Sequence, residues 1–196
     1  PAHLQEGGPG GRGLHKPPTV VPPKPIVKLG PGKYRVPTLG KTWAWNKALN
    51  RKLAPLATYE YNGFTYKTDH KGRVIQVKGF LKDKRADRHG YQQSKVGKMG
   101  YVGKDEGGHL IASIFNGPGE GINMVPMDGN LNKGAWKAME NGWAKEVDKG
   151  NKVHVEINLS YGGSGPKARP DSLQVKQRIN GGAPKTRVFK NRPGGV

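Results

Sequence analysis

Hydrophobic and polar residues alternate most regularly over residues 58–81, in TYEYNGFTYKTDHKGRVIQVKGFL. Asn62-Gly63 interrupts the alternation, and this dipeptide readily adopts the two positive φ angles of a tight hairpin turn. A second turn at residues 69–72 precedes another alternating run. The pattern therefore predicts a β-meander of about three strands.

The aromatic residues of this meander have two interpretations. They occupy every second position of the predicted strands, which is typical of one buried face of a sheet. Exposed aromatic rings also stack on nucleic-acid bases. The alternation favours the buried face for Tyr59, Tyr61, Phe64 and Tyr66.

A second pattern, with steps of three and four residues, predicts a helix that begins at Asn130 or Asn132. Its core-facing residues are Leu131, Ala135, Met139, Gly142, Trp143 and Val147. Asn132 and Glu140 lie on an adjacent face, because eight residues at about 100° each return to within about 80° of the start. An amide and a carboxylate would therefore border one cleft.

Alternation resumes at residues 152–160, where every second residue is aliphatic and points inward. His154 therefore points outward, and we do not expect it to bind a metal ion. Residues 173–190 are typical of a hairpin that turns at residues 180–184. With strands on either side of one central helix, the predicted fold class is α+β.

Residues 1–37 show neither the alternation of a strand nor the three- and four-residue steps of a helix. Residues 1–37 contain 9 Pro and 7 Gly, which predicts a linker, with a proline-rich ligand for a recognition module as the alternative. Residues 41–56 are typical of a short basic helix. We therefore expect a linker over residues 1–57, one domain over residues 58–192 and a tail over residues 193–196.

The chain is strongly basic, with 34 Lys and Arg residues against 14 Asp and Glu residues and a formal net charge of +20. Residues 1–57 hold ten basic residues and one acidic residue, which leaves 24 against 13 for residues 58–196. The predicted domain is therefore itself basic. Such a field favours polyanions, nucleic acids above all.

The absence of cysteine excludes disulfides, thiolate metal sites and thiol nucleophiles. No run approaches the roughly 20 apolar residues of a membrane span, and no apolar signal-peptide core lies near Pro1. A chain that starts without methionine is expected to be a fragment of a longer protein. Any metal ion must be held by oxygen or imidazole ligands.

Residues 105–140 supply the groups that metal-assisted phosphodiester hydrolysis needs. His109 lies between a diglycine and a buried strand predicted at residues 110–112, and histidine has the pKa of a general base near neutral pH. The side-chain oxygen of Asn132 suits a hard cation that neutralises charge on the phosphate. Each residue taken singly has a structural interpretation: a core histidine, a helix cap at Asn132 and a surface acid at Glu140.

Residues 82–104 are polar, basic and punctuated by glycine, which predicts a loop. Arg85 and Arg88 in this segment are candidates for substrate binding, because an arginine can hold two phosphate oxygens at once. An ordinary solvated loop is the alternative.

Four segments resemble a known family: KTDHKGRV at 67–74, GGHLIA at 107–112, FNGPGEGINMVP at 115–126 and NLNKGAWKAMENGWA at 130–144. Over residues 58–192 the chain resembles the bacterial DNA/RNA non-specific endonucleases, in the branch found as C-terminal toxin domains of secreted polymorphic toxins. The family pattern is a histidine, an asparagine, a second asparagine nine residues later and a glutamate eight residues beyond it. The matching catalytic candidates are His109, Asn123, Asn132 and Glu140.

The resemblance implies a ββα-metal fold that binds one Mg²⁺ ion, with other divalent cations as alternatives. His109 would be the general base and Asn132 the direct metal ligand, while Glu140 would act through metal-bound water. In the better-studied members Asp-Arg-Gly-His precedes the strand, whereas this chain has Glu106-Gly107-Gly108-His109. The missing arginine leaves its phosphate-binding role unassigned, with Arg85 or Arg88 as substitutes.

The function predicted from these observations is a magnesium-dependent, non-specific endonuclease that cuts DNA, with RNA as a second substrate. The resemblance adds a secreted antibacterial effector that acts in the cytoplasm of a target bacterial cell and is bound by an acidic immunity protein. A non-catalytic nucleic-acid-binding module is the main alternative, and an effector of a protein partner is another. A binding module would need neither His109 nor Asn132.

Overall fold

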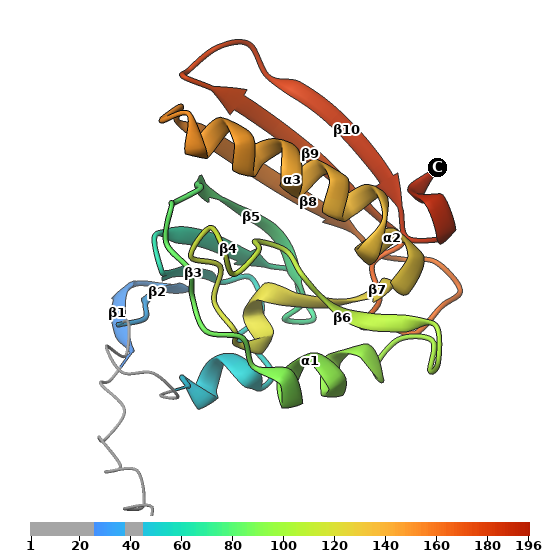
Figure 1. The fold of residues 1–196 in the computed structure, drawn as a ribbon. Coiled ribbons are helices and arrows are strands. Elements are labelled where there is room, and N and C mark those ends of the chain that lie inside the picture. Colours follow the sequence, from blue (N-terminus) through green and yellow to red (C-terminus); the bar gives the residue numbers. More distant parts are fainter. Residues whose placement is uncertain (1–25, 38–44) are drawn as a thin grey trace, which may run out of the picture.

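The computed structural model describes residues 26–37 and 45–196 (Figure 1). Its largest element is an eight-stranded sheet with the strand order β1-β2-β3-β4-β5-β8-β9-β10. Strands β2 and β3 run parallel, and the other neighbouring strands of this sheet run antiparallel. A separate hairpin of β6 and β7 and the helices α1, α2 and α3 accompany the sheet. This mixed architecture confirms the predicted α+β class.

The predicted meander is confirmed as β3 (Thr58–Tyr61), β4 (Phe64–Thr68) and β5 (Val74–Phe80). Asn62 and Gly63 turn the first hairpin with φ angles of 52° and 83°. The four aromatic side chains of β3 and β4 are buried, so they form the core face of the sheet.

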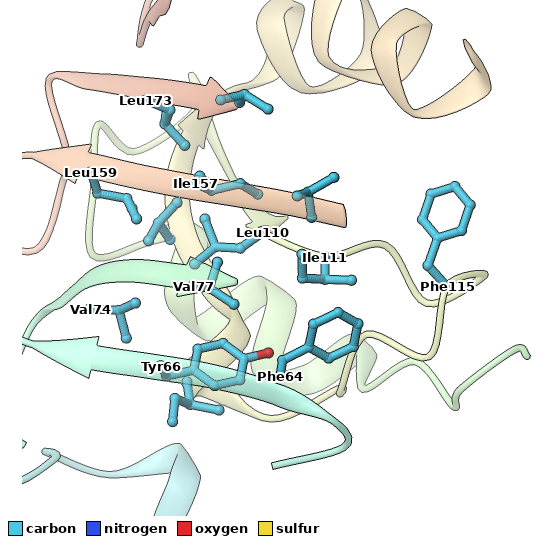
Figure 2. Close-up of a cluster of buried hydrophobic side chains, with 14 of the residues drawn as sticks. Phe64, Tyr66, Val74, Val77, Leu110, Ile111, Phe115, Ile157, Leu159 and Leu173 are labelled. Atoms are coloured by element: carbon cyan, nitrogen blue, oxygen red, sulfur yellow. The ribbon is translucent and has the colours of Figure 1, made fainter. Parts of the chain in front are cut away.

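The hydrophobic core joins this sheet to the segment that follows β6. Figure 2 shows Leu110 and Ile111 beside Val77 of β5 and Ile157 of β8. Leu110, Ile111, Val77 and Ile157 are all fully buried, and such a side chain contributes roughly 1.5–3 kcal/mol relative to an exposed one. The chain after β6 is therefore held firmly against the sheet.

The C-terminal strands β8 (Val153–Ser160), β9 (Ser172–Ile179) and β10 (Lys185–Lys190) are confirmed, with the β9–β10 turn at residues 180–184. Val153, Val155 and Ile157 point into the core. His154 points outward, as expected, and lies edge-on to Phe80 with ring centroids 4.9 Å apart.

Part of the predicted linker is folded. Strands β1 (Val27–Gly30) and β2 (Lys33–Arg35) form a hairpin that extends the sheet beyond β3, and Tyr34 stacks on Tyr59 with ring centroids 5.1 Å apart. These strands are short and mostly exposed, so they leave no hydrophobic period. Of the predicted helix at residues 41–56, a 3-10 turn, η1 (Lys47–Asn50), is present, and residues 41–44 lie outside the described residues.

The prediction that residues 82–104 form a loop is wrong, because α1 (Gly90–Gly97) lies within them. The side chain of His89 caps this helix by accepting a hydrogen bond from the backbone N–H of Gln92. Only Gln92, Val96 and Gly97 of the helix are buried. So few buried positions give too weak a period to predict the helix from sequence.

The predicted helix after Asn130 is also not continuous. It consists of α2 (Gly129–Lys133) and α3 (Ala135–Asp148), separated by Gly134 with φ −101° and ψ −106°. Asp128, not an asparagine, caps α2 by accepting a hydrogen bond from the N–H of Leu131. None of the described helices is long and apolar enough to cross a membrane. Two further 3-10 turns are η2 (Gly121–Asn123) and η3 (Pro193–Gly195).

Candidate active site

His109 is the last residue of β6 (Asp105–His109), which pairs antiparallel with β7 (Met124–Asp128). The two glycines before it are required by packing. A Cβ atom on Gly107 would lie 2.2 Å from the carbonyl oxygen of Gln93 in α1, and one on Gly108 would lie 2.8 Å from Cβ of Met127. No arginine fits at position 107 here, because α1 occupies the space that its side chain would need.

The imidazole of His109 is largely buried. Burial lowers its pKa to about 4, and the positive charge of Arg88 acts in the same direction. Its Nε2 atom has no hydrogen-bond partner among the described residues. A buried, unpaired ring nitrogen is costly for the fold, which is why such groups concentrate at functional sites.

Asn123 is fully buried and all of its amide atoms are bonded to protein. Its Oδ1 accepts hydrogen bonds from the Tyr66 hydroxyl at 3.0 Å and from the Ile111 N–H at 3.1 Å. Its Nδ2 donates to the carbonyl oxygens of Ile111 and Pro118 at 2.8 and 3.0 Å. Asn123 therefore holds the chain that follows His109 in place.

These bonds also explain why the strand predicted at residues 110–112 is wrong. Both backbone groups of Ile111 are engaged by the side chain of Asn123 and not by a neighbouring strand. The strand lies one step earlier, over residues 105–109. The apolar run after His109 is buried as a loop that packs on the large sheet.

Asn132 lies in α2, and its side chain returns to β6. Its Nδ2 donates a 2.8 Å hydrogen bond to Oε2 of Glu106, while Lys133 forms an ion pair with Oε1 of the same carboxylate. Partial burial alone would raise the pKa of Glu106, but the bonds from Lys133 and Asn132 hold it below its ordinary value. The amide is thereby fixed with its nitrogen on Glu106, which leaves Oδ1 for a ligand.

Glu140 lies in α3 and is buried. Burial raises the pKa of its carboxyl to about 7, against the opposing charges of Lys137 and Arg88. Arg88 thus influences both His109 and Glu140, which come from β6 and α3. Arg85 contributes to neither pKa shift. Of the two arginines that the sequence proposes, Arg88 is the one whose charge reaches both groups.

Two features of the site were not singled out as functional from the sequence. One is Glu106, and the only feature of the sequence that could have indicated its role is its position three residues before His109. The other is the anchor of β6, where Asp105 and Arg169 form a buried ion pair of 2.7 Å. Arg169 is 64 residues away in the chain, so no local pattern indicates this pair.

The donors present suit a hard, hydrated cation. The described residues include no group of three or more His, Cys, Asp or Glu side chains that could hold a metal ion. The oxygen ligands that the sequence predicts are the amide of Asn132 and the carboxylate of Glu140. Magnesium keeps most of its water when bound and fits so sparse a set, whereas zinc prefers several imidazoles or thiolates.

A family model for DNA/RNA non-specific endonucleases matches residues 55–181. The chain belongs to this family. The order of β6, β7 and the helices that carry Asn132 and Glu140 is the ββα arrangement expected for it. This domain is therefore an endonuclease, a hydrolase of phosphodiester bonds, and the family depends on a divalent metal ion.

Among curated proteins, the Type VII secretion system protein EssD of Staphylococcus aureus (strain USA300) is 35% identical over 135 residues. The match covers 64% of this chain and 22% of EssD, and EssD of strain NCTC 8325 / PS 47 matches equally. This chain therefore spans about a fifth of the length of these relatives. A solved structure described as an extracellular nuclease is 14% identical, with a TM-score of 0.39, and the match covers 61% of this chain and 78% of that one.

Proposed function

We propose that this chain is a magnesium-dependent endonuclease that cuts DNA, and RNA as a second substrate, without sequence preference. The observation that carries the proposal is the position of Arg88. Its charge affects the pKa of both His109 and Glu140, so a base and an acid lie within the electrostatic range of the same cation.

His109 is the proposed general base. Its low pKa keeps the ring neutral at pH 7, so the imidazole can accept a proton from the attacking water. A base with a pKa of about 4 is weak. The negative charge of a bound phosphate would raise this pKa towards neutrality and strengthen the base when substrate is present.

Asn132 and Glu140 are the proposed metal-binding residues. The Oδ1 atom of Asn132 would bind the ion directly, because Glu106 holds Nδ2 away, and Glu140 would orient a coordinated water. When bound, Mg²⁺ supplies charge neutralisation at the phosphate and at the leaving oxygen. Arg88 would bind the phosphate before hydrolysis, with Arg85 further out on the substrate.

Asn123 has the role of a positioning residue in this proposal. Its four hydrogen bonds hold residues 111–118, and this segment follows His109 directly. A shift of the segment would displace the base.

We also propose that the full-length protein is a secreted antibacterial toxin that acts in the cytoplasm of a target bacterial cell. The similarity to a Type VII secretion system protein supports this context. The net charge of +20 suits an acidic immunity protein that would bind the producing cell's own copy. Such an inhibitor would protect the producer from its own nuclease.

The test is cleavage of plasmid DNA and of a structured RNA by the purified chain, in Mg²⁺ and in chelator. His109→Ala should lose a factor of about 10² to 10⁴ in rate, the usual contribution of a positioned base, and should still bind uncut DNA. His70→Ala, at an exposed turn histidine, is the matched control and should cut normally. Binding without cleavage by the unaltered chain, in any divalent cation, would identify a binding module instead.

A further inference from the structure

The eight-stranded sheet has a solvent-exposed face that is distinct from the core face. The strand register places Lys67 opposite Gln76, then Asn158 and then Gln174, in one row across four strands. Side chains in such a row lie on the same face. The core residues Tyr66, Val77, Ile157 and Val175 form the neighbouring row. The row of Lys67 therefore points away from the core and from the segment after His109.

This outer face is basic. Register places seven basic side chains on it, and two acidic ones, Glu60 and Glu156. Each acid has an ion-pair partner, Arg35 for Glu60 at 3.1 Å and Lys176 for Glu156 at 3.9 Å. The basic residues of this face that form no ion pair with any described residue are Lys33, Lys67, Lys78, Arg178 and Lys190.

The same face contains an exposed aromatic pair beside a hollow. Phe80 is 53% exposed and packs edge-on against His154, which lies opposite Arg178 on the next strand. A cavity of about 360 Å³ adjoins this pair and is lined by His154, Glu156, Lys176, Arg178, Pro184 and Thr186. Aromatic rings within a basic surface are the combination that binds single-stranded nucleic acid.

We propose that this face is a second nucleic-acid site, separate from the His109 centre, which binds a single strand of DNA or RNA. A base would stack on the exposed ring of Phe80, with its nucleotide in the hollow beside His154. The phosphates on either side would lie against Arg178 and against Lys78 and Lys67. The polar side chains of Gln76, Asn158 and Gln174 are hydrogen-bonded to one another in a row between these basic residues.

Such a site would keep the enzyme on a long substrate between cuts. It would lower the KM for long strands and leave the turnover of small phosphodiesters unchanged, because it lies away from the reacting groups. The proposal concerns binding and does not depend on the catalytic roles of His109 and Asn132.

The test is binding of a labelled 30-nucleotide oligothymidylate in chelator, where no cleavage interferes. The triple variant Lys67→Gln, Lys78→Gln, Arg178→Gln should bind at least tenfold more weakly. Its slope of log K against log salt should be shallower by about 2, since three phosphate contacts at about 0.7 each are lost. Phe80→Leu keeps an apolar side chain without the ring and should weaken binding roughly 5- to 150-fold.

A matched triple variant, Lys52→Gln, Lys71→Gln, Lys145→Gln, removes the same charge from exposed positions elsewhere. It should bind nearly as the unaltered chain does. Hydrolysis of bis(p-nitrophenyl) phosphate should be equal in both triple variants, which shows that the catalytic centre is intact. If the chain hydrolyses nothing, the binding measurements still decide this proposal while the proposed function fails.

Equal oligothymidylate affinity of the two triple variants would overturn the proposal. A complementary measurement uses poly-glutamate as the probe. If the outer-face triple variant lost affinity for poly-glutamate alone and kept that for oligothymidylate, the face would bind an acidic protein, and the second nucleic-acid site would not exist.

Discussion

The side-chain amide of Asn132 is hydrogen-bonded to the carboxylate of Glu106, 26 residues earlier in the chain, at 2.8 Å. This bond connects α2 to β6, the strand that ends at His109. Because the nitrogen is committed to Glu106, the oxygen of the amide faces away from it. The orientation of the proposed metal ligand thus depends on an acid that would not itself contact the metal.

Glu106→Ala should raise the magnesium concentration needed for half-maximal cleavage by about 10- to 100-fold, the usual effect of losing a partner of a metal ligand. The amide of Asn132 would rotate freely, which weakens metal binding more than turnover at saturating metal. Glu106→Gln keeps an acceptor oxygen and should lie in between. Glu146→Ala, at the far end of α3, is the control, and an unchanged metal dependence for Glu106→Ala would contradict the positioning role.

The pH dependence of stability should contain two opposing contributions. The pKa of His109 is about 4 in the fold and ordinarily 6.5, so the unfolded chain takes up a proton first and stability falls as pH drops from 6.5 towards 4. The pKa of Glu140 is about 7 in the fold and ordinarily 4.5, so the folded chain takes up the proton first. Its contribution is present below pH 4.5 and is lost as pH rises through 7.

Single variants separate these contributions. When the pH falls from 7 to 5, the free energy of unfolding of Glu140→Gln should decrease by about 2 kcal/mol relative to the change in the unaltered chain. That of His109→Ala should increase by about 2 kcal/mol relative to the same reference. Urea denaturation in chelator measures both. Variants whose pH slopes match that of the unaltered chain would show that neither group is buried as described.

Arg88→Ala should lower kcat/KM for DNA about 10- to 100-fold, the value of one hydrogen bond to a charged group in this setting. Arg85→Ala, in the same segment, should stay within a factor of about three, because its charge reaches neither His109 nor Glu140. Arg88→Lys should recover part of the loss in kcat/KM, because lysine keeps the positive charge but cannot form the bidentate hydrogen bonds of a guanidinium group. Equal losses of kcat/KM for the Arg85 and Arg88 variants would show that Arg88 has no specific role in binding the phosphate.

Alanine substitutions of Asn123 and of Asn132 should have different effects on the stability of the fold. Asn123→Ala leaves the Tyr66 hydroxyl and both backbone groups of Ile111 unpaired in the core, and should cost about 3 kcal/mol or more. Asn132→Ala should lose nearly all cleavage while changing stability by about 0.5 kcal/mol or less. Thermal denaturation and plasmid cleavage together measure this. A stable, inactive Asn123→Ala would instead point to a direct catalytic role.

Elements that depend on neighbouring residues alone could be predicted from the sequence. Alternating residues and the Asn62-Gly63 turn predicted β3, β4 and β5, because burial on one face of a strand leaves a period of two. The spacing of His109, Asn123, Asn132 and Glu140 carried the family pattern, since these residues lie close together in the chain, between β6 and α3. The outward position of His154 followed from the same alternation.

The contacts among these residues could not be predicted in this way, because they depend on how distant segments pack. Gly107 is a glycine because α1 packs directly on it, yet α1 buries too few residues to reveal itself in a hydrophobic period. The break at Gly134, the bond between Asn132 and Glu106, and the shared influence of Arg88 depend on segments that are distant in the chain. A local sequence pattern indicates whether a residue faces the core or the solvent. The direction of a polar side chain depends instead on the partner that folding brings to it.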